Sequence, residues 1–284
     1  MKMTKKLAVA AVVGSSVSVQ GGATLAKHLL PMIGPGGAVL LRIGLAGILI
    51  SLFHRPSFRS FTRTQWPCIL LYAFSIAAMN TCFYNGVGRV PLGVAVTIEF
   101  LGPLTLALVR SRSALDILWA LLAGLGIFLI VPWHKGCGAV DFVGVGFVSA
   151  AGLLWALYIV ASDRIAGRVK NADAVSAGMC LAALLVLPYG LGSGVLLHLT
   201  PTIALLGLGI AIFSSALPFT LDMLSLNSLP GKTFGVLQSL QPAIAALSGL
   251  VFLDEKLALV QWFAILAIIV SSTGATLTTK AKNT

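Results

Sequence analysis

The chain has 284 residues, of which 58% are hydrophobic and only 10% are charged, and its mean hydropathy is +1.00. Soluble globular domains do not combine so much apolar sequence with so little charge. The formal net charge of +11 does not indicate nucleic-acid binding, because the basic residues are scattered over short polar segments and form no continuous face. The composition predicts an all-α integral membrane protein surrounded by the lipid bilayer.

Apolar stretches of the length that crosses a bilayer as a helix, about 20 residues, alternate with short polar segments along the chain. The least marked boundary is the turn from Gly88 to Pro91. The first stretch continues to Leu30 without a convincing small-residue cleavage site, so we interpret it as a retained helix and not as a secretory leader. We predict ten transmembrane helices, at residues 7–30, 35–53, 67–88, 92–110, 114–132, 142–162, 173–191, 202–222, 230–252 and 257–277.

Lysine and arginine are distributed unevenly between the two sides of this ten-helix arrangement. One side carries 14 of these residues and the other carries five, which are Lys27, Arg42, Arg89, Lys135 and Lys256. Membrane proteins keep the loops that are rich in lysine and arginine in the cytoplasm. The sequence therefore predicts a multi-pass protein with its N- and C-termini in the cytoplasm, which agrees with an even number of helices.

The two halves of the chain are related to each other. Adding 139 to the residue number aligns residues 71–116 with residues 210–255 without gaps. Helix-breaking prolines recur at the same spacing in both halves, as Pro91 and Pro103 and as Pro230 and Pro242. Many transporters consist of two such repeats, and an odd number of helices per half places consecutive halves in opposite orientations. We predict two inverted five-helix repeats, at residues 1–134 and 140–279.

Glu99 is the sharpest polar feature inside the apolar stretches. It lies eight residues after Pro91, and a charge near the bilayer centre costs at least about 2.5 to 3.5 kcal/mol, so such a residue normally faces a cavity or a partner. Pro103 also leaves a backbone carbonyl free one turn away. We interpret Glu99 as part of a pathway for substrate or protons. The structural alternative is a pairing with Arg42 or with a neighbouring hydroxyl group.

Other polar and aromatic residues inside the predicted helices are candidates for the same pathway. They are Arg42, Lys27, Gln20, Asn80, Tyr84, Trp155, Tyr158, Gln238 and Gln241. Amides and phenols also hold helices together, and the long side chains of Lys27 and Arg42 can reach the membrane interface. Gln238 is the repeat partner of Glu99, so one half has an amide where the other has a carboxylate. Asp222 ends a predicted helix, where we expect it to be solvated.

The sequence lacks the motifs that accompany catalysis and cofactor binding. It contains no nucleotide-binding loop, zinc-binding helix or nucleophile elbow. Its four cysteines and four histidines have no metal-binding spacing. We predict no metal, no cofactor and no enzymatic activity. Prolines within the predicted helices are candidate hinges for a moving transporter, and they are Pro103, Pro218 and Pro242.

Four parts of the sequence carry a resemblance to a known family, and they are Gln20–Lys27, Arg42, Val90–Pro103 and Ser215–Phe219. With them the chain resembles the EamA type of the drug/metabolite transporter superfamily, and within it the bacterial threonine/homoserine exporters. The resemblance implies ten helices in the inner membrane, a central cavity, an amino-acid substrate and export from the cytoplasm. Those exporters carry Glu-Pro where this chain has Gln241 and Pro242, a change that bears on substrate charge or coupling.

The main hypothesis is a secondary transporter that exports small neutral amino acids such as threonine or homoserine, coupled to protons and working by alternating access. Glu99 would exchange a proton or hold the substrate ammonium group, and Arg42 or Lys27 would bind its carboxylate. The alternative cargo is an aromatic amino acid or a cationic drug, with Trp155 and Tyr158 stacking on a ring. A scaffold without transport activity would not need buried polar groups, and the charge rings of a selective channel are absent. A homodimer is compatible with the sequence but not required by it.

Overall fold

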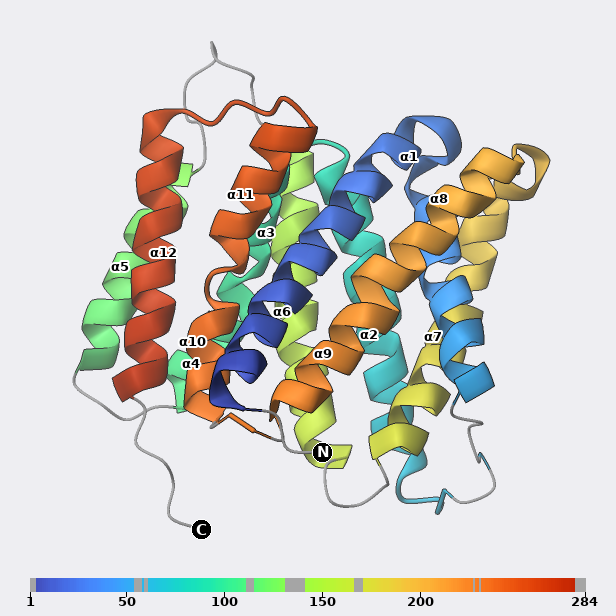
Figure 1. Ribbon diagram of the computed structural model, residues 1–284, viewed down its shortest axis with the longest axis horizontal. Coiled ribbons are helices and arrows are strands. Elements are labelled where there is room, and N and C mark those ends of the chain that lie inside the picture. Colours follow the sequence, from blue (N-terminus) through green and yellow to red (C-terminus); the bar gives the residue numbers. More distant parts are fainter. Residues whose placement is uncertain are drawn as a thin grey trace.

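The computed structural model describes residues 4–53, 58, 61–110, 115–130, 141–165, 171–226, 228–229 and 231–278. Within these ranges the regular structure is entirely helical (Figure 1). The elements are α1 (Lys5–Phe53), α2 (Trp66–Val87), α3 (Leu92–Glu99), α4 (Leu101–Arg110), α5 (Leu115–Ile130), α6 (Phe142–Ile165), α7 (Asn171–Gly192), the 3-10 turn η2 (Val195–Leu197), α8 (Pro201–Ala211), the π-helix η3 (Ile212–Ala216), α9 (Leu217–Leu226), α10 (Gly231–Gln238), α11 (Gln241–Phe252) and α12 (Leu259–Thr278).

The helices have the length and surface of a membrane protein. Within the described ranges, five helical segments are long and apolar enough to cross a bilayer, and four shorter apolar helices accompany them. Large apolar side chains on the outside are strongly exposed, for example Ile117 at 69% and Leu121 at 67% on α5. Water disfavours apolar surface of this extent, whereas lipid accepts it. The chain is therefore a multi-pass membrane protein, as its composition predicts.

Several predicted spans differ from the helices of the structure. The first two predicted spans agree with the structure, because α1 consists of two helices on either side of a kink at Gly34, where φ is 68° and ψ is 173°. This conformation is open to glycine because glycine has no Cβ atom. The predicted fourth span is divided into α3 and α4, the eighth into α8, η3 and α9, and the ninth into α10 and α11. Sequence hydropathy does not detect the breaks in the fourth, eighth and ninth spans, because each span is apolar when averaged over its whole length.

The breaks in the fourth and ninth predicted spans fall at matching positions. Helix α3 ends at Glu99 and α10 ends at Gln238, which are partners under the offset of 139 residues. Pro103 and Pro242 follow in the first turns of α4 and α11, where the missing backbone N–H of proline does no harm. The packing matches as well, because α3 and α4 contact α6 whereas α10 and α11 contact α1. Helices α3 and α11 also pack against each other (Figure 1).

Glycines allow two of these contacts to be unusually close. A Cβ atom added at Gly102 would collide with the backbone carbonyl of Gly152 on α6, and one added at Gly152 would lie 2.7 Å from the Glu99 carbonyl oxygen. A Cβ atom at Gly22 on α1 would collide with the side chain of Ser214 in η3. Small residues of this kind let helices in a membrane approach until their backbones touch. The helix break after Glu99 therefore packs closely against α6, and the π-helix η3 packs closely against α1.

Candidate functional site

Arg42 lies in the interior between α1, α2 and η3. Its Nη1 donates to the Tyr84 hydroxyl and its Nη2 to the Ser214 carbonyl, each at 3.4 Å, and its guanidinium lies 5.7 Å from the centre of the Tyr84 ring. These contacts are long and involve neutral groups. Within the described ranges no carboxylate forms an ion pair with Arg42. A guanidinium with five donors and no anionic partner is suited to bind a carboxylate.

Glu99 places a carboxyl group in the same interior. It is the last residue of α3 and only 9% exposed. Among the described residues, no hydrogen bond or ion pair to its carboxylate occurs, yet Arg42 is close enough to act on it electrostatically. The sequence-based alternative, a directly paired Glu99 and Arg42, is therefore not what the structure contains. Within the part of the chain that the structure describes, the Glu99 carboxyl group has no hydrogen bond, and Arg42 donates only to neutral groups.

Two buried oxygen atoms in this region have no hydrogen-bond partner, namely Gln20 Oε1 and Ser214 Oγ. Ser214 packs against Gly22 of α1, the helix that also carries Gln20. A π-helix often occurs at functional sites, and Ser214 is a buried residue of the π-helix η3. A buried acceptor without a partner costs about 1–3 kcal/mol. These acceptors would be satisfied by a ligand that carries hydrogen-bond donors.

Lys27 has a different environment from the one that the sequence suggested. Its ammonium group forms an ion pair with Glu255 and donates to the Val90 carbonyl at 2.9 Å. The second Glu255 oxygen accepts from the Leu92 backbone N–H at 2.6 Å. Both side chains are largely buried, at 20% and 14% exposure. The Lys27 charge is therefore already neutralised, and Arg42 is the better of the two candidates for binding a carboxylate.

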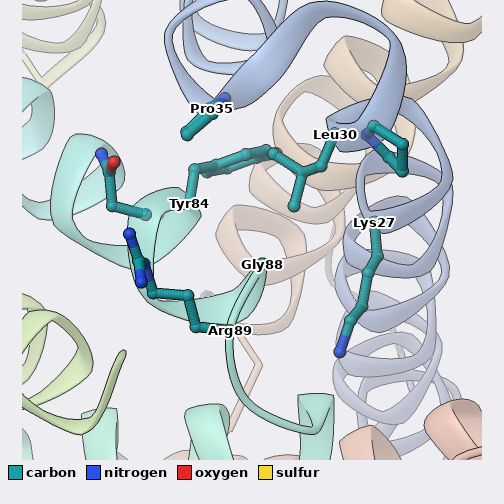
Figure 2. Close-up of a pocket in the computed structure, with 8 residues that line it drawn as sticks. Lys27, Leu30, Pro35, Tyr84, Gly88 and Arg89 are labelled. Carbon is teal, nitrogen blue, oxygen red and sulfur yellow. The ribbon is translucent and has the colours of Figure 1, made fainter. Parts of the chain in front are cut away.

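A cleft of about 450 Å³ lies next to this ion pair (Figure 2). It is lined by Lys27, Leu30, Pro31, Pro35, Tyr84, Asn85, Gly88 and Arg89. Figure 2 shows Lys27 and Arg89 on opposite sides of the cleft, with Gly88 between them. Tyr84 belongs both to the cleft wall and to the contacts of Arg42. Tyr84 therefore links the cleft to the half-buried Arg42.

The ion pair between Lys27 and Glu255 is expected to stabilise the protein strongly. Removing one partner of a buried pair leaves the other charge uncompensated, which costs about 3–5 kcal/mol. We therefore expect Glu255→Gln to lower the melting temperature of the purified protein markedly. The control is Asp141→Asn, which removes an exposed pair with Arg89. Equal melting temperatures for the two variants would contradict this role.

The exposed pair also has a predictable dependence on pH. The Arg89 guanidinium donates to Asp141 at 2.6 Å and, together with the Val143 N–H, holds the pKa of that carboxyl below its ordinary value. Any stabilisation from this pair is present above the ordinary pKa of aspartate and is lost as the pH falls through the lowered value. Screening by water keeps the contribution small, which makes Asp141→Asn a suitable control.

Gln238 and Gln241 are brought together at the second break. Gln238 Oε1 accepts from Gln241 Nε2 at 2.5 Å and from the Ser16 hydroxyl at 3.4 Å. Gln238 Nε2 donates to Asp222 Oδ2 at 3.4 Å. The expectation that Asp222 is solvated was wrong, because its other oxygen, Oδ1, is buried without a partner. Its burial depends on α1 packing against α9, and the local sequence does not report that contact.

The other predicted residues are engaged within the helix bundle. Asn80 donates to the Ile76 carbonyl of its own helix at 2.8 Å. Trp155 meets Phe100 edge to face at 5.8 Å between ring centres, and Tyr158 stacks on Tyr72 at 5.1 Å. Among the described residues, no hydrogen bond joins Asn80, Trp155 or Tyr158 to Arg42 or Glu99. Their part in a substrate pathway stays a prediction.

The three hinge candidates lie where helices are irregular. Pro103 and Pro242 follow the two breaks. Pro218 is the second residue of α9, which follows the π-helix, and its carbonyl accepts from the Ser15 hydroxyl at 3.3 Å. Their movement stays a prediction. The helix-breaking proline Pro230 and the predicted junction between the halves, at residues 135–139, lie outside the described residues.

Comparison with known proteins gives consistent similarities. The model of the EamA-like transporter family matches residues 142–277. The threonine/homoserine exporter RhtA of Escherichia coli (strain K12) is 40% identical over 283 residues, which cover 99% of this chain and 95% of that protein. The exporter of the same name from Salmonella typhimurium (strain LT2) is 40% identical over 263 residues, covering 92% and 88%. A protein of known crystal structure, 18% identical, has the same fold with a TM-score of 0.59 over 98% of both chains.

Proposed function

The chain belongs to the EamA-like transporter family, and from that premise we propose that it exports small neutral amino acids such as threonine and homoserine. Its curated relatives are exporters and not enzymes, in agreement with the lack of catalytic motifs. The observation that carries the amino-acid proposal is the presence of Glu99, whose carboxyl group has no hydrogen-bond or ion-pair partner among the described residues, near Arg42, which bonds only neutral groups there. A zwitterion is the substrate class whose two ends match such a pair.

The arrangement gives each end of an amino acid a partner. Arg42 offers guanidinium donors to the substrate carboxylate, and Glu99 accepts from its ammonium group. The open acceptors of Gln20 and Ser214 suit the remaining ammonium hydrogens or a side-chain hydroxyl, which threonine and homoserine both possess. Buried polar groups of this kind discriminate strongly against substrates that leave them unpaired.

Ten membrane crossings in two inverted repeats, residues 1–134 and 140–279, remain our proposal for the topology. Support comes from the matched ends of α3 and α10 and from their equivalent packing on α6 and α1. Helix α1 begins and α12 ends at the same end of the bundle (Figure 1). The bias of lysine and arginine assigns that end to the cytoplasm, so both termini are proposed to be cytoplasmic.

Alternating access is the proposed mechanism, with a proton as the coupling ion. Lys27 of the first proposed repeat pairs with Glu255 of the second, and the backbone of Val90 and Leu92 adds a hydrogen bond to each partner. The pair therefore joins the two proposed repeats at the end opposite to the termini. This pair would keep the outer end closed while substrate enters from the cytoplasm. Export would then require the pair to separate as the halves move relative to each other.

Binding of the substrate carboxylate by Arg42 can be tested with an analogue. Threonine amide keeps the ammonium and hydroxyl groups of threonine but has no carboxylate. We expect the wild-type protein to discriminate against the amide by about 2–5 kcal/mol, the usual range for a buried charge pair. Arg42→Gln is expected to lose most of that discrimination, measured by competition for threonine export. Undiminished discrimination in Arg42→Gln would remove Arg42 from the site.

The competing cargo, an aromatic amino acid or a cationic drug, requires stacking surfaces. Trp155 and Tyr158, the residues predicted to stack, already pack on Phe100 and Tyr72. We therefore expect threonine and homoserine to inhibit export of labelled threonine, whereas phenylalanine and a cationic dye do not. Inhibition by the dye or by phenylalanine, but not by homoserine, would favour the alternative cargo.

A further inference from the structure

Asp222 is a carboxylate in the helical interior that the zwitterion site does not use. It lies on α9 between α1 and α10, and its Oδ1 is buried without a hydrogen-bond partner. Its Oδ2 accepts only a long contact from Gln238 Nε2 at 3.4 Å, and the Ser15 hydroxyl lies beside the same carboxyl group. An acceptor-only group with an open, buried oxygen is costly in this environment.

The surroundings of Asp222 contain no compensating cation among the described side chains. The groups facing it are the hydroxyl of Ser15 on α1 and the amide of Gln238 on α10. The π-helix η3, which also packs on α9, brings no ionisable residue. Lys5 and Lys6 are exposed at the beginning of α1. By contrast, Glu99 has the positive charge of Arg42 in its neighbourhood.

Gln238 links Asp222 to the second helix break. It ends α10 at the position that matches Glu99 and contacts Gln241 at the beginning of α11. In the first half, the Glu99 carboxylate lies at the helix break itself. In the second half, the Asp222 carboxylate lies on the neighbouring helix α9 and contacts the break through the Gln238 amide. Any motion of α10 relative to α9 changes the contacts of Asp222 directly.

We propose that Asp222 is the proton-binding residue of the transporter, and that Glu99 serves the substrate ammonium group. This inference rests on the proposed export of amino acids. In each cycle one proton from the outer side binds the Asp222 carboxylate, is carried inward as α9 and α10 move, and leaves to the cytoplasm. No bond other than that O–H bond forms or breaks. Protonation also gives Asp222 a neutral form, which is the cheaper state for a buried carboxyl without a cation.

The test separates proton movement from substrate binding in proteoliposomes that contain the full-length protein. Threonine counterflow, the exchange of labelled for unlabelled threonine without a gradient, requires the substrate site alone. Threonine-dependent proton flux, recorded with a trapped pH dye, requires coupling. We expect Asp222→Asn to keep counterflow and to lose proton flux. We expect Glu99→Gln to lose both activities and Asp222→Glu to keep both.

The outcomes of this test distinguish the proposed role of Asp222 from the proposed export of threonine. Threonine-dependent proton flux that persists in Asp222→Asn overturns the proposal for Asp222 and leaves the proposed export intact. Loss of counterflow in correctly inserted Asp222→Asn makes Asp222 a substrate-binding residue and also overturns it. Absence of counterflow in the wild-type protein contradicts the proposed function itself.

If Asp222→Asn does not reach the membrane, a second variant tests the proton-binding role of Asp222. Gln238→Met removes the donor to the ionised carboxylate and keeps the carboxyl group. Because the ionised form loses its hydrogen bond, the pH midpoint of proton-coupled flux is expected to move upward. An unchanged midpoint in Gln238→Met would overturn the proposal.

Discussion

Glu99→Gln is expected to abolish threonine export while the protein still folds and inserts. The change keeps the size of the side chain but removes the negative charge that would hold the substrate ammonium group. Loss of one partner from a buried charge pair costs about 2–5 kcal/mol, so affinity would fall by one to several orders of magnitude. Export of labelled threonine from inner-membrane vesicles, normalised to the amount of protein, measures the effect.

The matched control for this prediction is Asp254→Asn. It makes the same chemical change at an exposed residue outside the helices. Asp254 has a positive φ of 53°, and asparagine tolerates that conformation. The control is expected to export threonine like the wild type. Export by Glu99→Gln at the level of the control would exclude Glu99 from the transport pathway.

A large loss of stability is expected for Gly102→Ala. The new methyl group would collide with the Gly152 backbone, and backbone cannot move aside as a flexible side chain can. Overpacking a tight contact costs about 1–3 kcal/mol and occasionally more, and we expect Gly102→Ala at the upper end of that range. The melting temperature of the purified protein in detergent, read by size-exclusion chromatography after heating, reports the loss.

Gly124→Ala provides the control, because a Cβ atom at Gly124 on α5 would meet no atom within 4 Å. Alanine is also the better helix former. This variant is therefore expected to melt at the wild-type temperature or above it. If Gly102→Ala were as stable as Gly124→Ala, the close approach of the first helix break to α6 would be wrong.

The sequence was most informative where the physical signal is local. Composition alone predicts a helical membrane protein, and this is confirmed. Glu99 stands out because a carboxylate among apolar residues is expensive, and the structure buries it at the end of α3. The helix break was not predicted as such, although Pro103 pointed to irregular backbone nearby. The ten-helix count and the role of Glu99 in transport stay predictions.

Contacts between distant segments could not be predicted in the same way. Lys27 and Glu255 are 228 residues apart, and nothing near either residue in the sequence indicates its partner. Asp222 looked like a helix-end residue in water because its burial depends on α1. Tyr84 and Arg42 were both selected for their polarity, yet their mutual contact follows from the packing of α2 against α1. Tertiary packing therefore decides which of the polar residues are already satisfied.

The most direct test of the central claim is efflux of radiolabelled threonine from cells that express this chain, compared with cells that carry the empty vector. The proposal predicts faster efflux with the chain and a return to the empty-vector rate when an uncoupler removes the proton gradient. Efflux at the empty-vector rate from cells in which the protein is demonstrably in the inner membrane would contradict threonine export.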